Sequence, residues 1–169
     1  MASKLMDRLA KRVLVTDGAM GTMLQAAGLK SGQCGEQWNA TEKAKVQEIH
    51  RAYLKAGSDI VLTNTFGGNT FRLKEYGFEN QAPLFNREAA RLAREAADEF
   101  DALVFGDIGP SGQMMEPYGP VTEEEMFDAF RRQARALVEG GVDALIVETM
   151  TSAAELAAAV RAARECAGD

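Results

Sequence analysis

The chain has 169 residues, 46% of them hydrophobic, and its 19 basic and 25 acidic side chains give a formal net charge of −6. This length suits one domain with a hydrophobic core, and the acidic balance argues against a general nucleic-acid binder, which needs a basic face. No apolar run approaches the roughly 20 residues that span a bilayer, and the charged residues 1–12 lack the apolar centre of a signal peptide. Two cysteines are too few for a disulfide scaffold and indicate a reducing compartment, so we expect a cytoplasmic protein.

Four short apolar runs, each ending in a polar residue, predict β-strands. They are nearly continuous rather than alternating and are rich in β-branched and aromatic residues, which is typical of parallel strands covered on both faces. The sequence therefore indicates an α/β protein with a parallel sheet. The runs are Val13–Asp17, Ile60–Asn64, Leu103–Asp107 and Ala144–Glu148.

Amphipathic helical patterns separate and follow these runs. Gly57 stands just after the first pattern, where a left-handed C-terminal cap is expected. The third and fourth patterns each open with a capping box, in which Ser or Thr is followed three residues later by Glu. The first two patterns cover Thr41–Ala56 and about residues 83–100. The third begins at Thr122 and the fourth at Ser152.

The polar residues that end the predicted strands are 47, 43 and 41 residues apart, so a βα unit recurs at a steady period. Such a period fits either a doubly wound sheet or a barrel. A dinucleotide-binding sheet needs a tight glycine fingerprint after its first strand, and Asp17-Gly18-Ala19-Met20-Gly21 does not match it. We therefore expect a parallel (βα)8 TIM-barrel type fold, of which residues 1–169 supply about four βα units without an internal domain boundary.

Asp17, Asn64, Asp107 and Glu148 end the four predicted strands. The C-terminal ends of parallel strands meet at one mouth of such a fold, where active sites lie, so we expect these four side chains to converge. Three carboxylates and an amide at one mouth suit a cationic group such as an amino-acid ammonium, or an acid or base. The alternative is that these acids only cap the following helices or form turns.

The sequence assigns no metal ligand and no catalytic residue. Zinc sites need three or four Cys or His ligands, usually at a characteristic spacing. Cys34 and Cys166 lie far apart in the chain, and His50, the only histidine, lies beside the apolar stripe of a predicted helix. We therefore expect His50 to be a packing or capping residue.

The segment Asp17–Gln25, with the sequence Asp-Gly-Ala-Met-Gly-Thr-Met-Leu-Gln, resembles the opening motif of the homocysteine S-methyltransferase family. The resemblance continues in order over residues 11–165. Within the family, the Asp-Gly-Ala-Met-Gly-Thr and Gly-Asp-Ile-Gly-Pro segments are most similar to the homocysteine-binding N-terminal module of cobalamin-dependent methionine synthase. The other matching segments are Ile49–Tyr53, Ala56–Ile60, Thr63–Gly67, Gly106–Gly112, Glu139–Asp143 and Val147–Thr149.

The resemblance implies that residues 1–169 are the N-terminal half of a (βα)8 barrel whose mouth binds homocysteine. By motif position Asp17 and Glu148 would hold the amino acid, and Gly18, Asn64 and Thr65 would line the mouth. The family transfers a methyl group, in the cobalamin-dependent branch from methylcobalamin, to the homocysteine thiolate, which is bound to zinc.

In the family, three cysteine thiolates hold the zinc. They lie in an Asn-Cys segment and a Gly-Gly-Cys-Cys-Gly-Thr segment after later strands, and neither segment occurs in this chain. The zinc ligands are therefore expected outside the chain, and cobalamin on another domain or subunit. By itself the chain is expected to be inactive.

Two alternatives remain open. The methyl donor is betaine or S-methylmethionine in related enzymes, and nothing in this half selects the donor. Alternatively, the chain is a non-catalytic half-barrel that self-associates, because an open four-stranded piece exposes unpaired strand edges. The expected partners are homocysteine, the missing C-terminal half-barrel or a second copy of the chain, and cobalamin and folate domains, but neither nucleic acid nor a membrane.

Overall fold

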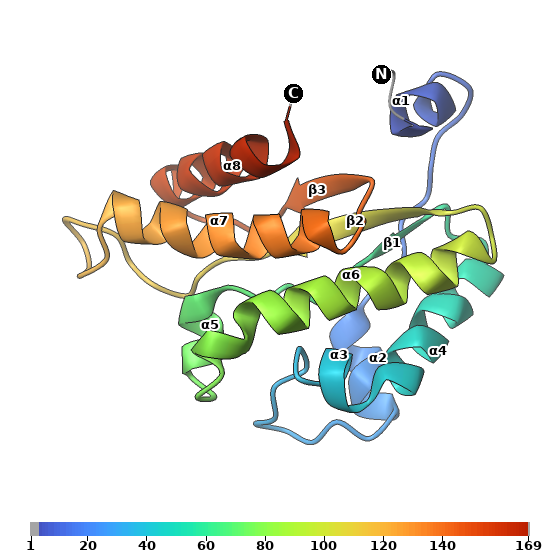
Figure 1. The fold of residues 1–169 in the computed structure, drawn as a ribbon, viewed down its shortest axis with the longest axis horizontal. Helices are drawn as coiled ribbons and strands as arrows, with labels where there is room; N and C mark the ends of the chain where they lie inside the picture. The colour runs from blue at the N-terminus through green and yellow to red at the C-terminus, as the bar shows by residue number, and fades with distance from the viewer. Residues whose placement is uncertain (1–3, 169) are drawn as a thin grey trace.

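The computed structural model describes residues 4–168, which form a parallel sheet with helices packed against it (Figure 1). The strands are β1 (Ile60–Leu62), β2 (Leu103–Ile108) and β3 (Ala144–Val147), and both neighbouring pairs are parallel. Their spatial order, β1-β2-β3, follows the order of the chain. A doubly wound sheet reverses its strand order at a switch point, so this sequential order favours part of a barrel. The parallel pairing, with helices packed against the sheet, confirms the predicted α/β class.

The prediction of a regular strand at Val13–Asp17 is wrong. Thr16 makes only an isolated parallel bridge with Ile60. Val13 and Val15 are 85% and 58% exposed, so no described part of the chain covers them. A parallel strand is stabilised by burial of its apolar side chains on both faces, and this run lacks that cover.

The backbone of this run nevertheless follows β1 for a short distance. Ile60 N–H donates to the Val15 carbonyl at 3.2 Å, and Asp17 N–H donates to the Ile60 carbonyl at 2.9 Å. The next bond of the ladder, from Leu62 N–H, goes to the side-chain Oδ2 of Asp17 at 3.1 Å. The Asp17 carboxylate thus replaces the main-chain acceptor that a longer strand would have supplied.

Four long helices occur where the sequence predicts them (Figure 1). Val61 and Val104 on the sheet pack with alanines of α6 and with Leu54 of α4, while Ile108 packs in a second apolar cluster with α7 and α8. Gly57 has a φ of 107°, as expected of a left-handed cap. The helices are α4 (Lys43–Lys55), α6 (Ala82–Asp98), α7 (Glu123–Glu139) and α8 (Ala153–Ala167).

Several shorter helices were not predicted. The glycine-rich motif after Asp17 leads into a helix rather than an open turn, because Leu24 is buried there against Trp38 and Val46. None of the described helices is long and apolar enough to cross a membrane. The additional elements are α1 (Lys4–Leu9), α2 (Met20–Ala26), α3 (Trp38–Thr41), α5 (Thr70–Lys74) and the 3-10 helix η1 (Glu79–Gln81).

Only one of the two predicted capping boxes is complete. At α7, Thr122 Oγ1 accepts from Glu125 N–H, and Glu125 accepts in return from the Thr122 backbone. At α8, Glu155 N–H donates to Ser152, but the buried Glu155 carboxylate accepts instead from the backbone and hydroxyl of Ser111, at 2.7 and 2.6 Å. Glu155 therefore attaches the loop after β2 to the start of α8.

His50 is a packing residue, as expected. Its side chain is fully buried on α4, and neither ring nitrogen has a hydrogen-bond partner. Burial lowers its pKa to about 4, because the charged imidazolium is not solvated inside the protein. The native protein therefore holds His50 neutral through the pH range in which an unfolded chain takes up a proton.

We predict that His50 makes the protein sensitive to mild acid. As pH falls from the ordinary histidine pKa of about 6.5 towards 4, only the unfolded state is protonated, so up to about 3 kcal/mol of stability is lost. Replacing His50 with Leu removes this loss. Urea unfolding at pH 7 and pH 4.5 measures this loss. Val46→Ala on the same helix is the control, and it is expected to lower the free energy of unfolding equally at both pH values. An equal loss in wild type and His50→Leu would contradict the prediction.

Candidate substrate-binding site

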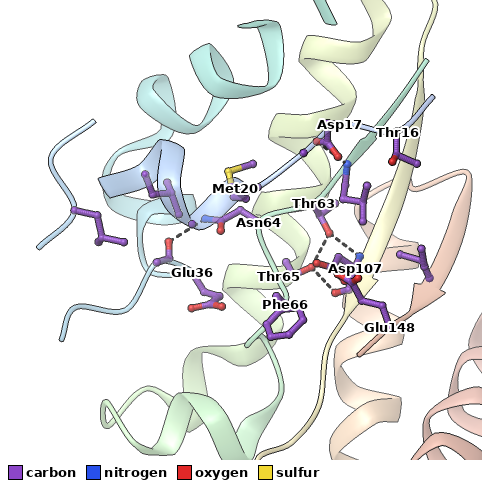
Figure 2. A pocket seen from close by; sticks show the side chains of 18 of the residues that line it. Thr16, Asp17, Met20, Glu36, Thr63, Asn64, Thr65, Phe66, Asp107 and Glu148 are labelled. Carbon is purple, nitrogen blue, oxygen red and sulfur yellow. Dashed lines mark hydrogen bonds between the residues drawn. The ribbon is translucent and has the colours of Figure 1, made fainter. Parts of the chain in front are cut away.

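A cavity of about 590 Å³ opens at the C-terminal ends of the strands (Figure 2). The four strand-end residues predicted to converge, Asp17, Asn64, Asp107 and Glu148, all line it. Gly18 and Thr65, which the family motif also places at the mouth, line it too. The structure thus brings all the sequence-predicted site residues to one cavity, while their role in binding a substrate stays a prediction.

Asp17 places one carboxylate oxygen in the cavity wall without a partner. Its Oδ2 accepts the Leu62 N–H described above, and its Oδ1 is buried with no hydrogen bond. Burial, partly offset by the Leu62 hydrogen bond and reinforced by the nearby Glu148 charge, raises the pKa of Asp17 to about 7. Near neutral pH the group is therefore poised between its acid and its carboxylate.

Asp107 lies deeper than Asp17, and it is 6% exposed. Its Oδ1 is buried without a partner, and Figure 2 shows its carboxyl group beside Glu148. Burial first, and the adjacent Glu148 second, raise the pKa of Asp107 to about 8. Asp107 therefore retains a proton at neutral pH when the cavity holds no cation.

Asn64 and Thr65 are at the mouth, but their side chains bond to the protein. Asn64 Nδ2 donates to the Gly35 carbonyl at 2.9 Å and to Asn39 Oδ1 at 3.0 Å. Thr65 Oγ1 donates to the Asp107 carbonyl at 2.7 Å. Both residues therefore shape the mouth by holding neighbouring segments in place.

Gly18 allows the segment before α2 to lie close to α4. A Cβ atom at this position would come within 3.3 Å of the Tyr53 ring. The Tyr53 hydroxyl also donates to the Ala19 carbonyl at 3.2 Å, so Tyr53 supports the backbone on which Asp17 and Gly18 lie. A side chain at position 18 would displace this backbone or the ring.

Glu36 and Phe66 also line the cavity, and sequence reasoning missed both. Glu36 Oε1 accepts from Gly67 N–H at 2.8 Å, and Glu36 Oε2 accepts from the Cys34 thiol at 3.3 Å. Glu36 therefore connects the segment before α3 to the loop after β1. Neither periodicity nor a strand end marks Glu36 in the sequence, because contacts distant in the chain bring it to the cavity.

The lining of the cavity is strongly acidic. It includes Asp17, Glu36, Asp107 and Glu148, and among the described residues that line it there is no Lys, Arg or His. Apolar side chains occupy the other part of the wall. Such a cavity suits a ligand with a cationic group and a short apolar chain. The apolar residues are Ala19, Met20, Leu24, Leu29, Leu62, Phe66 and Ile146.

The two cysteines do not fit a zinc site. Cys34 packs with Leu73 and Phe85, whereas Cys166 lies near the end of α8 in a different cluster. Burial raises the pKa of the Cys34 thiol to about 12, the opposite of what a zinc thiolate requires. Within residues 4–168 no three His, Cys, Asp or Glu side chains are grouped so that they could hold a metal ion.

The sheet order and the acidic mouth agree with one family of methyltransferases. A model of the homocysteine S-methyltransferase family matches residues 14–168, and the chain belongs to that family. Its relatives include the methionine synthase of Mycobacterium tuberculosis (strain ATCC 25618 / H37Rv), which is 37% identical over 95% of this chain, and that of Mycobacterium leprae (strain TN), which is 36% identical over 95%. The chain spans only 14% of the length of each of these two proteins.

Solved structures show the same fold. The homocysteine methyltransferase MmuM from Escherichia coli in its oxidised form is similar with a TM-score of 0.77 and 25% identity, over 91% of this chain and 59% of that one. Its metallated form has the same TM-score of 0.77, with 24% identity over 94% and 61% of the two chains. The likeness therefore extends over nearly all of this chain and about three-fifths of the enzyme.

We predict that replacing Asp107 with Asn stabilises the protein at alkaline pH. The native state holds a proton on Asp107 up to about pH 8, whereas an unfolded chain loses it near pH 4, so the stability from this proton falls as pH rises between these values. Asn keeps the neutral form, and at pH 9 the variant is expected to be more stable by on the order of 2 kcal/mol.

Chemical denaturation at pH 5, 7 and 9 measures this difference. Asp98→Asn on α6, where the carboxylate is 66% exposed, is the matched control and is expected to leave the pH profile unchanged. If Asp107→Asn is less stable than wild type at pH 9, burial does not disfavour the charged form of Asp107.

Proposed function

We propose that this chain is the N-terminal part of the homocysteine-binding barrel of a methionine synthase-type methyltransferase, and that its mouth holds the amino-acid end of homocysteine. One observation carries this assignment. Asp17 and Asp107 both line a cavity whose described lining contains acidic but no basic side chains, and each has a buried carboxylate oxygen without a hydrogen-bond partner. An ammonium group has three donors and a positive charge, so it suits a cavity that several carboxylates line.

Binding of the ammonium group would be coupled to proton release. Asp107 and Glu148 are adjacent, and without a cation one carboxyl proton reduces their mutual repulsion. A cation at this point favours both carboxylates, so the retained proton leaves to solvent as the substrate enters. Gly18 keeps the backbone free of a side chain at the mouth, and Leu62 and Ile146 offer apolar surface to the substrate chain.

We propose residues 1–169 as one unit, the N-terminal half of a (βα)8 barrel with about four βα units. The sequential parallel order of the strands supports this, as does the coverage of about three-fifths of the Escherichia coli enzyme. The backbone of residues 15–17, which bonds to β1 at Ile60, would then be the first strand. In a closed barrel a further strand would cover it.

We place zinc and cobalamin outside this chain. Cys34 and Cys166 do not fit a thiolate site, so the zinc ligands would come from another segment or subunit, and methylcobalamin from another domain. The chain by itself would then bind homocysteine and transfer no methyl group. Two cysteines are too few for a disulfide scaffold, and on this ground we place the chain in the reducing cytoplasm.

A second candidate is a half-barrel that self-associates without catalysis. The exposed Val13 and Val15 beside β1, and the outer edge of β3, which pairs with no other described strand, favour it. Light scattering over a range of concentrations tests this. A well-folded monomer at high concentration counts against self-association. A betaine- or S-methylmethionine-dependent enzyme stays a further alternative, because the donor would be bound outside these residues.

We predict that the purified chain binds homocysteine through the ammonium group. In calorimetric titrations at pH 7.5, 4-mercaptobutyrate, which lacks the ammonium, is expected to bind at least about tenfold more weakly. Asp17→Asn and Glu148→Gln are each expected to weaken homocysteine binding about tenfold, because an ammonium then loses one charged acceptor.

The same titration in buffers with different ionisation enthalpies reports the released proton. Asp98→Asn is the control for a lost exposed charge and is expected to bind as wild type does. Equal affinity for homocysteine and 4-mercaptobutyrate would overturn the proposed role of the acidic mouth.

A further inference from the structure

A buried glutamine of α7 connects the two strand ends that carry the mouth. Gln133 is fully buried on a helix face that is otherwise apolar. Its Nε2 donates to the Thr65 carbonyl at 2.8 Å and to the Asp107 carbonyl at 3.4 Å. A single amide group thus joins the segment that follows β1 to the end of β2.

This connection lies where the main-chain ladder between the two strands gives way to side chains. Thr63 N–H still donates to the Phe105 carbonyl at 2.9 Å. In the next bond, Asp107 N–H donates to the side-chain Oγ1 of Thr63 at 3.0 Å, and Thr65 Oγ1 donates back to the Asp107 carbonyl. On its β1 side, the N–H and carbonyl of Asp107 are therefore held by side chains, while the ladder to β3 continues on the other side. Gln133 is the one among these side chains that comes from a helix.

Close packing leaves the Gln133 amide little room to move. A Cβ atom at Gly68 would lie 2.9 Å from Gln133 Nε2 and closer still to Asn86 Oδ1. Asn86 is itself fully buried and donates to the Gly68 carbonyl at 2.7 Å. Gln133 does not line the cavity, so any influence it has on a ligand passes through Thr65 and Asp107.

We infer that Gln133 is a positioning residue of the acidic mouth, which sets the direction of the Asp107 carboxyl group by holding the main chain of both strand ends. For substrate affinity this inference rests on the proposed homocysteine-binding function. For the geometry at Asp107 it is independent of that function. The charged groups that face Asp107 are Glu148, Asp17 and Glu36, and each comes from a different segment of the chain.

The test is Gln133→Met, which keeps the length of the side chain and removes its donors. Without the amide the strand ends loosen and water reaches Asp107, so the carboxyl carbon of Asp107, followed by ¹³C NMR, is expected to titrate at least about one pH unit lower than in wild type. Homocysteine is expected to bind about five- to tenfold more weakly, because the carboxyl group is no longer held in place before binding.

Two further variants separate positioning from general stability. Phe130→Leu, also on α7 and fully buried, weakens the core without touching either carbonyl, and is expected to leave the Asp107 titration and the affinity as in wild type. Gln133→Glu, held neutral by its burial, keeps one hydroxyl donor. It is expected to restore most of the wild-type titration. If Gln133→Met does not fold, Gln133→Leu, which also lacks a donor, takes its place in the same measurement.

An unchanged Asp107 titration in Gln133→Met, or an equal change in Phe130→Leu, overturns the inference. If wild type does not bind homocysteine, the proposed function fails, while the NMR titration still decides the role of Gln133. A shift of Asp107 in the Gln133→Met variant alone supports the inference in either case.

Discussion

The mouth of this protein depends on the replacement of main-chain hydrogen bonds by side chains at the point where the sheet ends. Neighbouring parallel strands satisfy each other's backbone hydrogen bonds as far as their last paired residues. Beyond that point each backbone donor needs another acceptor. Here Leu62 N–H donates to the Asp17 carboxylate, and Asp107 N–H donates to the Thr63 hydroxyl. The residues that complete the sheet are therefore also those that face the cavity or hold the residues that do.

This arrangement determines the electrostatics of the site. The Asp17 carboxylate completes the ladder beside β1, while the Asp107 carboxyl group is buried at the end of β2. Burial is the largest cause of the raised pKa at both residues. Glu148 adds its charge to both, and no basic side chain among the described lining residues offsets it. A bound cation would therefore supply the positive charge that the described lining lacks, as the proposed amino-acid ammonium does.

Much of the fold could be predicted, because the apolar runs and amphipathic patterns report local burial directly. The strand ends at Asn64, Asp107 and Glu148 lie at one mouth because all parallel strands point the same way. The run at Val13 shows the limit of such reasoning. Its composition is that of a buried strand, but a buried strand also needs neighbours on both sides. Among the described residues only β1 pairs with this run, so Val13 and Val15 stay exposed.

The sequence by itself determined the α/β class, the family and the acidic residues at the strand ends, since these depend on residue type and spacing along the chain. Only the tertiary structure decided which acids are buried, that Glu36 joins the site, and that Gln133 reaches Thr65 and Asp107 from a helix. The physical reason is that pKa shifts and buried amide contacts arise from desolvation and from groups distant in sequence. Neither leaves a periodic pattern in the chain.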